Sequence, residues 1–448
     1  MPWNTNRLTT LVTTITIALM LSIATTSKTR ASNVVPAPPQ TRPILLTGAT
    51  IHPVSGPSLT NSQILLVQGK IQALGSNLTR PTGTEVVDVS GKHIYPGLIS
   101  ANTVLGLVEI SSVRGTLDLS EPGAVNPNAR AAVSVNPDSE LFPVARANGV
   151  LAALTVPQSR GGLVAGTSSL LKLDGWTWEE MTLKPTVGLH VFWPNLVINR
   201  DPRFPKSPED QKTDQDKQLR QLKEAFATAR AYQKARTVNP STLKDARWEA
   251  MLPVLSAKVP VFIHAGEIKQ IQSALQWADG EKLAVVLVGG QDAWRMTTLL
   301  KERNIPVILS QVMDLPLRRS DSYDSIYSSP RKLFEAGVKF CVANDGTDFA
   351  AHQDRNLPYQ AGMAAAFGLP KEEALKSVTL YPAQILGVAD RMGSLEVGKD
   401  ATLIITTGDP LEVTTQVERA YIQGRPLDLT NRQTRLYEKY RQKYEQIK

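Results

Sequence analysis

The 448-residue sequence has little sulfur and little imidazole: one cysteine and five histidines. The single Cys341 excludes an internal disulfide, and its place in the apolar run GVKFCVAND predicts a buried side chain, not a nucleophile. Gly-x-Ser-x-Gly, His-Glu-x-x-His and Cys-x-x-Cys are all absent. The sequence therefore does not carry the motifs of nucleophile-elbow serine hydrolases, of helix-borne zinc proteases or of thiol redox proteins.

The sequence also lacks the composition of a nucleic-acid-binding protein. A hydrophobic fraction of 42% and a charged fraction of 20% are typical of a soluble globular protein with a large core. The net charge is +8, and much of the basic excess lies in residues 429–448, which we expect to form a solvated basic helix. Arginine does not alternate with aromatic residues, so we expect no nucleic-acid partner.

One long apolar run is present, and it lies at the N-terminus. Arg7 precedes the run from Leu11 to Thr26, and Ala31 offers a small residue for cleavage. This order predicts a signal peptide over residues 1–31 and a secreted or periplasmic protein that keeps no stable membrane anchor after cleavage. The alternative is an uncleaved anchor helix, because the run is nearly long enough to span a bilayer. Residues 32–41 read as a Pro-rich linker.

The pattern of the remaining chain predicts an α/β fold in three parts. Residues 42–96 contain short alternating runs, with a tight hairpin turn at residues 68–70. Residues 97–392 alternate apolar β-runs with helical segments, which is typical of a parallel sheet built from βα units. Residues 393–428 return to short strands. We expect these and residues 42–96 to form one small β-sandwich beside the central part.

Two stretches of this sequence resemble the amidohydrolase superfamily, in the branch of imidazolonepropionase-like metal-dependent hydrolases. YPGLI at residues 95–99 resembles the Pro-Gly-Leu-Ile-Asp-x-His-x-His motif that opens the family's barrel. The stretch RNLPYQAGMAAAFGLPKEEALKSVTLYPAQILGVADRMGSLEVGKDATLII at residues 355–405 resembles the family's C-terminal signature. The resemblance implies a (β/α)8 TIM-type barrel over residues 97–392. It also implies one or two divalent metals that activate water against a C–N bond.

The family's metal ligands are only partly kept. The resemblance implies two histidines after strand 1, a lysine or glutamate at strand 4, histidines at strands 5 and 6, and an aspartate at strand 8. His264 matches the strand 5 position and Asp345 the strand 8 position, while His190 is the candidate at strand 4. Three positions are degenerate, because they hold residues that cannot replace an imidazole: Asn102 and Val104 at strand 1, and Gly289 at strand 6.

These losses exclude a two-metal site, because a catalytic metal is normally held by about three protein ligands. We expect one divalent metal such as zinc, weakly bound by His190, His264 and Asp345, or none. For His190 the alternative is a polar side chain satisfied by its neighbours. His352 and Arg355, on the loop after Asp345, are candidate residues for substrate binding.

Two functions follow from these residues. The first is an exported hydrolase that acts on a non-peptide C–N bond with at most one metal and with Asp345 as general base. The second is a non-catalytic ligand-binding protein that keeps the barrel pocket. Either would take a small molecule as its substrate or ligand, and the sequence leaves the oligomeric state open.

Overall fold

The computed structural model describes residues 35–159 and 161–447. The predicted signal peptide, residues 1–31, lies outside these described residues. Within them, no helix is both long enough and apolar enough to cross a membrane. The described residues from Pro36 onward cluster as one compact unit, and they form three β-sheets.

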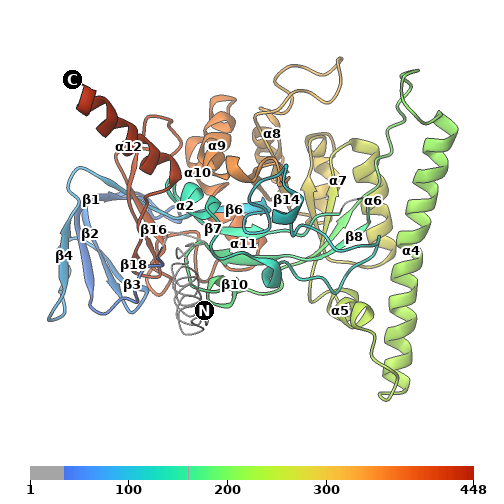
Figure 1. Cartoon of the computed structure of the whole chain (residues 1–448), viewed down its shortest axis with the longest axis horizontal. Helices are drawn as coiled ribbons and strands as arrows, with labels where there is room; N and C mark the ends of the chain where they lie inside the picture. The colour runs from blue at the N-terminus through green and yellow to red at the C-terminus, as the bar shows by residue number, and fades with distance from the viewer. Residues whose placement is uncertain (1–34, 160, 448) are drawn as a thin grey trace, which may run out of the picture. The chain divides into compact units, whose positions relative to one another are not determined.

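The first sheet is assembled from both ends of this unit (Figure 1). Its strand order is β18-β17-β16-β5-β1-β2-β3, and β4 pairs with β1. The two ends meet where β16 runs antiparallel to β5, with Leu403 opposite Pro96 and Thr406 opposite His93. Its strands are β1 (Ile44–Ile51), β2 (Leu59–Val67), β3 (Lys70–Gly75), β4 (Glu85–Asp88), β5 (His93–Pro96), β16 (Leu403–Thr406), β17 (Val417–Ile422) and β18 (Arg425–Pro426).

The hairpin between β2 and β3 follows from its two turn residues. Gln68 and Gly69 have φ values of 49° and 77°, so both lie in the left-handed region. Positive φ at both central residues is the geometry of the two-residue turn that matches the twist of paired strands. Val67 and Lys70 pair directly beside the turn. The tight turn predicted at residues 68–70 is confirmed.

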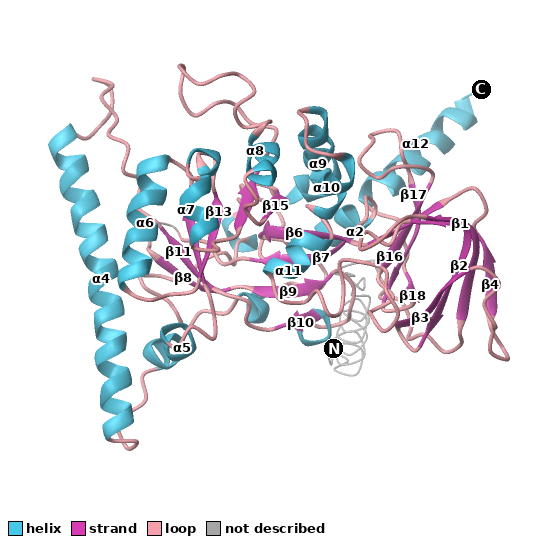
Figure 2. Cartoon of the chain, turned by 180° about the vertical axis from the view of Figure 1, so that it is seen from behind, coloured by secondary structure: helices cyan, strands magenta, loops and turns pink. Residues whose placement is uncertain are grey.

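The central part holds two further sheets (Figure 2). One has the order β10-β9-β7-β6 and the other β15-β14-β13-β12-β11-β8. Strands β11 to β15 are parallel, whereas β9 is antiparallel to β7 and β8 is antiparallel to β11. The strands are β6 (Leu98–Thr103), β7 (Val150–Thr155), β8 (Val164–Thr167), β9 (Ser169–Lys172), β10 (Thr182–Lys184), β11 (Leu189–Phe192), β12 (Val261–Ala265), β13 (Val285–Gly289), β14 (Val307–Ser310) and β15 (Phe340–Ala343).

The two central sheets are connected in two places. At one of them the edge strand β8 and the inner strand β9 are separated only by Ser168, so a single segment passes from one sheet into the other. At the other, the edge strand β6 lies beside the edge strand β15, and the Asn102 amide donates to the backbone oxygens of Asn344 and Asp345 at 3.3 and 3.1 Å. The result is an α/β structure with mixed sheets.

Helices connect and cover these strands. The longest, α4, begins after Ser207, whose hydroxyl accepts from the Asp210 backbone N–H, and Pro208 occupies its first turn. The α-helices are α2 (Leu141–Arg146), α3 (Trp178–Met181), α4 (Pro208–Val238), α5 (Ala246–Leu255), α6 (Ile268–Gly280), α7 (Thr297–Glu302), α8 (Ser329–Glu335), α9 (Leu357–Ala366), α10 (Lys371–Lys376), α11 (Leu380–Ile385) and α12 (Arg432–Ile447). The 3₁₀ helices are η1 (Arg114–Thr116), η2 (Ala131–Ser134), η3 (Ala293–Arg295) and η4 (Ala351–Asn356).

The central strands are buried on both faces. Along β12, Val261 and Ile263 belong to the apolar cluster that includes residues of α4, α6 and α9, whereas Phe262 belongs to a second cluster with residues of α11. Alternate side chains of a strand point to opposite faces, so both faces of these strands pack in apolar layers. Polar side chains with room for chemistry are therefore confined to the strand ends and the loops that follow them.

Candidate functional site

The candidate site lies at the C-terminal ends of the central strands. Because β11 to β15 are parallel, these ends face the same way. His190 and His264 lie on adjacent strands, β11 and β12, and Phe192 is the register partner of His264. Gly289 is the last residue of β13, and Asp345 follows β15 by two residues. The structure thus places the predicted strand 4, 5 and 6 residues on the adjacent parallel strands β11, β12 and β13, and the strand 8 residue just after β15, with β14 between β13 and β15.

Only two of the predicted ligands come together. His190 Nδ1 lies 2.8 Å from His264 Nε2, within hydrogen-bonding distance. The ring of Phe192 stacks on His264 with centroids 4.0 Å apart, and Phe262 lies 5.0 Å from the His190 ring. Burial lowers the pKa of His264 to about 3, and burial with the neighbouring imidazole lowers the pKa of His190 well below its usual value. Both rings are therefore neutral at pH 7.

The hydrogen bond between the rings uses one nitrogen of each. In a neutral imidazole one nitrogen donates and the other accepts, so the pair shares a single proton across this contact. His190 Nε2 is buried and has no hydrogen-bond partner among the described residues. Outside this contact the pair therefore keeps one N–H and one lone pair, and it is enclosed by aromatic rings and lacks a third polar partner in the described part of the chain.

The strand 1 position has a different role in this structure. The Asn102 amide donates to Ser310 Oγ at 3.3 Å as well as to the end of β15, while its Oδ1 is buried without a partner among the described residues. Gly346 packs directly against this amide: at its φ of +75°, a Cβ would lie 2.3 Å from Asn102 Nδ2. Val104 is buried in the apolar core. Asn102 therefore connects β6 to β15.

The strand 6 position excludes an imidazole on conformational grounds. Gly289 has a φ of +99°, which L side chains rarely adopt, and a Cβ there would lie 3.1 Å from the backbone oxygen of Ala265. A histidine at this residue would need the backbone at the end of β13 to change.

The remaining predicted residues do not join the histidine pair. Asp345 is exposed, and its carboxylate accepts a hydrogen bond from Thr347 Oγ1 at 2.9 Å. His352 and Arg355 are exposed on η4, and His352 packs edge-on against Phe349. The structure thus keeps these three side chains at the solvent-facing side of the loop after β15.

The divalent ion implied by the family resemblance does not fit this set of donors. Within residues 35–159 and 161–447, no group of three or more His, Cys, Asp and Glu side chains is arranged to hold a metal ion. His190 and His264 supply two nitrogens, whereas a catalytic zinc is normally held by about three protein ligands. These residues therefore do not make up the ligand set of a catalytic metal.

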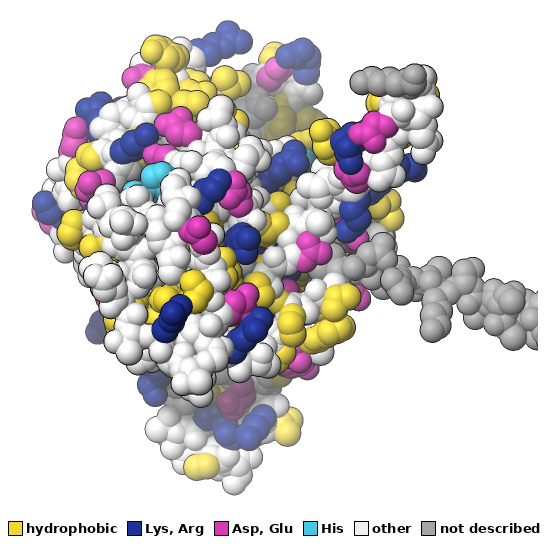
Figure 3. Space-filling model, turned by 90° about the vertical axis from the view of Figure 1, so that its left-hand side faces the viewer, with side chains coloured by type: hydrophobic (Ala, Val, Ile, Leu, Met, Phe, Trp, Pro, Cys, Tyr) yellow, Lys and Arg dark blue, Asp and Glu magenta, His cyan; other side chains and the backbone are white. Residues whose placement is uncertain are grey.

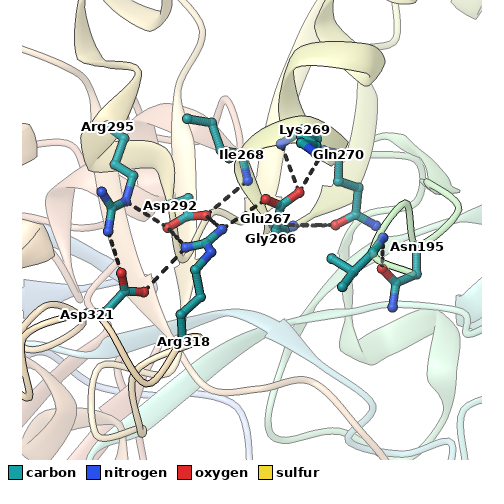
Figure 4. Close-up of polar contacts among 11 residues, drawn as sticks. Asn195, Gly266, Glu267, Ile268, Lys269, Gln270, Asp292, Arg295, Arg318 and Asp321 are labelled. Atoms are coloured by element: carbon teal, nitrogen blue, oxygen red, sulfur yellow. Dashed lines mark hydrogen bonds and ion pairs between the residues drawn. The ribbon is translucent and has the colours of Figure 1, made fainter. Parts of the chain in front are cut away.

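A charged cluster beside the site was missed by sequence reasoning. Arg318, on the loop after β14, contacts Asp292 at 2.6 Å, Glu267 at 2.9 Å and Asp321 at 3.3 Å (Figure 4). Hydrogen bonds to Asp292 raise the pKa of Arg318 above its usual value. Burial raises the pKa of Asp292, but hydrogen bonds from Arg318 and the Ile268 backbone outweigh it, so the net shift is downward.

This cluster ties the loop to the ends of two strands. Glu267 follows β12 and caps α6, where it accepts from the Lys269 and Gln270 backbones, and Asp292 follows β13. Arg318 lies far from both in sequence and has no motif around it. The sequence pattern could have located Glu267 and Asp292, because both are polar residues that follow the ends of predicted strands. It could not have located Arg318.

A polar cavity opens at the loops that follow β6 and β7. Its volume is about 480 Å³. Asp118, Glu121 and Arg130 line it from the loop after β6, and Pro157 lines it from the end of β7. Among the described residues, none of the three charged side chains forms a salt bridge. The cavity thus presents charges of both signs.

Comparison with known proteins identifies the family. The amidohydrolase family model matches residues 179–427. Amidohydrolase tasK from Hapsidospora irregularis is 20% identical, with 77% of this chain and 37% of that protein covered. Imidazolonepropionase from Brucella anthropi is 28% identical, with 33% of this chain and 35% of that protein covered. The chain thus spans about a third of the length of these curated relatives.

A solved structure extends the likeness over most of the chain. The amidohydrolase from Thermotoga maritima MSB8 superposes with a TM-score of 0.76 at 26% identity, and the match covers 86% of this chain and 99% of that chain. This likeness implies a TIM-type barrel for the central strands, and the predicted membership of the amidohydrolase superfamily is confirmed. On the match to its family model over more than half of its length, the chain belongs to the amidohydrolase family.

Proposed function

We propose that this amidohydrolase-family chain binds a small molecule bearing an amide or related C–N group at the C-terminal ends of its central strands, without metal-assisted hydrolysis. The observation that carries the proposal is the isolation of the His190–His264 pair. Among the described residues, the other family ligand positions hold no available metal ligand. Val104 is apolar and Gly289 has no side chain. The Asn102 amide bonds to the segment after β15, and Asp345 faces solvent.

The polar cavity at the loops after β6 and β7 supports binding. A volume of about 480 Å³ lies within the range of small-molecule sites. Arg130 on one wall suits a carboxylate or a carbonyl oxygen, while Asp118 and Glu121 suit an amine or an amide N–H. We therefore propose a ligand that carries both kinds of group within the span of one small molecule.

A second candidate function is hydrolysis of a non-peptide C–N bond with at most one divalent ion. Two observations favour it: both imidazoles are neutral, as metal coordination requires, and His190 Nε2 has no partner among the described residues. Its relatives are named for amidohydrolase and imidazolonepropionase chemistry. Asp345 would be the base in this candidate, and its carboxylate would then have to leave Thr347.

A ligand screen and a turnover assay distinguish the two functions. Thermal-shift measurements with N-acyl amino acids, cyclic amides and N-formyl amines report binding, and product analysis with added Zn²⁺, Co²⁺ or Mn²⁺ reports hydrolysis. We expect binding without turnover, weakened by Arg130→Ala and unaffected by Arg80→Ala, which changes an exposed arginine on the loop between β3 and β4. Metal-dependent turnover that disappears in both His190→Ala and His264→Ala would instead establish the second candidate.

We also propose that the chain is exported and cleaved before Ser32. The order of Arg7, the apolar run and Ala31 supports this proposal. N-terminal sequencing of the protein from its native cell should begin near Ser32 in a secreted or periplasmic fraction. Recovery of Met1 from a membrane fraction would contradict it.

A further inference from the structure

The C-terminal helix α12 presents an aromatic face that nothing in the described structure covers. The helix extends away from the sheets in both views (Figures 1 and 2). None of its residues 432–447 is buried. Tyr437, Tyr440, Tyr444 and Ile447 are 49–71% exposed and follow one another at intervals of three, four and three residues. This spacing places all four on one side of the helix.

The helix is attached through its first turn. Asn431 is buried, and its side chain accepts from the backbone N–H groups of Gln433 and Thr434. Arg435 then pairs with Glu140 at 2.9 Å. The following three turns have no such contact among the described residues. An isolated helix of this length is marginally stable in water. A partner that covers its aromatic face would therefore stabilise it.

The charges of the helix indicate what kind of partner fits. Glu438 and Glu445, its two acidic residues, both pair with Arg441, at 2.7 and 2.6 Å. Lys439 and Lys443 form no salt bridge with the described residues, and each lies about 6 Å from a tyrosine ring of the same face. The helix thus carries uncompensated positive charge beside its aromatic face.

These charges argue against a second copy of the same helix as the partner, because two such faces would bring like charges together. The neighbouring surface carries Lys/Arg and Asp/Glu side chains interspersed, without a field of one sign on the face in view (Figure 3). Tyrosine rings favour the headgroup level of a bilayer, and lysines beside them favour anionic lipids. We propose that α12 is a docking helix for an anionic phospholipid surface, bound reversibly through its tyrosine face and its free lysines.

Vesicle sedimentation tests this proposal. We would use the chain from Ser32, because the described residues from Pro36 onward form one compact unit. It should sediment with phosphatidylcholine vesicles that contain about a third of phosphatidylglycerol, and much less with pure phosphatidylcholine. Lys439→Gln with Lys443→Gln removes two charges and should weaken binding about thirtyfold. Tyr440→Ser with Tyr444→Ser should weaken it about tenfold or more.

The matched control for the lysine pair is Lys212→Gln with Lys217→Gln, two exposed lysines on α4, and Tyr323→Ser controls for the tyrosines. These controls should bind as the parent does, and all variants should keep its melting temperature, because the changed side chains are exposed. Three results would overturn the proposal: no sedimentation with either vesicle, equal sedimentation with both, or a dimer in light scattering that Tyr440→Ser with Tyr444→Ser dissociates. The last would assign the face to a second copy.

Discussion

Asp354 provides the most informative test of how the central sheets are joined. This wholly buried carboxylate on η4 accepts hydrogen bonds from Ser100 Oγ at 3.0 Å, from Asn344 Nδ2 at 2.8 Å and from Thr103 Oγ1. Ser100 and Thr103 belong to β6, and Asn344 follows β15. Asp354 thus ties together two strands between which the described structure has no backbone ladder.

The free-energy cost of burying the Asp354 carboxyl group depends on pH. Burial raises the pKa of Asp354 from 3.8 to about 6, and the three hydrogen bonds only partly offset this rise. A carboxyl group with a raised pKa in the folded state stabilises the fold below its unfolded pKa, and this stabilisation is lost as pH rises through about 6. Between pH 4.5 and pH 8 the loss amounts to about 2 kcal/mol of the free energy of unfolding.

Asp354→Asn removes this titration while keeping the size of the side chain. Urea unfolding at pH 4.5 and pH 8 should show a free energy of unfolding that changes by about 2 kcal/mol more in the parent than in the variant. Asp216→Asn, at an exposed residue of α4, is the control and should follow the parent. Parallel pH profiles for the parent and Asp354→Asn would refute the reasoning.

A second variant tests the hydrogen bonds separately from the charge. Asp354→Ala leaves the donors from Ser100, Thr103 and Asn344 without their buried acceptor. Each unsatisfied buried group costs about 1–3 kcal/mol, so the variant should lose about 3 kcal/mol or more at both pH values. A loss below about 1 kcal/mol would show that Asp354 does not join β6 to β15.

Two further predictions concern the strand ends. Arg318→Gln leaves the buried Asp292 without its main cation and should lower the free energy of unfolding by about 2 kcal/mol, less than for a fully enclosed pair because Arg318 is 33% exposed. The loss should shrink in 1 M NaCl, and a salt-independent loss would contradict this electrostatic account. Gly346→Ala should cost more than Gly83→Ala by at least about 1 kcal/mol in urea unfolding, because both glycines have φ near +76° but only at Gly346 would the new Cβ meet Asn102. Equal costs would show that the contact is unimportant.

Much of the fold could be predicted from local sequence patterns. The apolar runs around His190, His264 and Cys341 were predicted as strands, and they form β11, β12 and β15. A strand that is buried on both faces has apolar side chains on both, so its sequence is an unbroken hydrophobic run. The turn at Gln68–Gly69 followed from the flanking alternation. These features depend on residues that are neighbours in the chain, and such residues can be interpreted without knowing the fold.

The site depended on contacts that the sequence does not display. The antiparallel β8–β9 segment was missed because its short runs separated by Ser168 look like a loop with glycines. Nothing near Arg318 or Asp354 indicated partners 26 to 254 residues away. The family resemblance located His190 and His264 on their strands and Asp345 just after β15, but which way Asp345 points depends on the loop after β15 and on Thr347.

Measuring the metal content is the most direct test of the claim that the strand ends lack a full set of protein ligands for a catalytic metal. The chain would be purified from zinc-replete medium, passed through a chelator column and analysed by mass spectrometry for bound metals. We predict less than one equivalent of any divalent ion per chain. Any residual ion should be lost in His264→Ala and retained in His52→Ala, whose ring pairs with His93 in the first sheet. One or more equivalents per chain that survive the chelator would contradict the account.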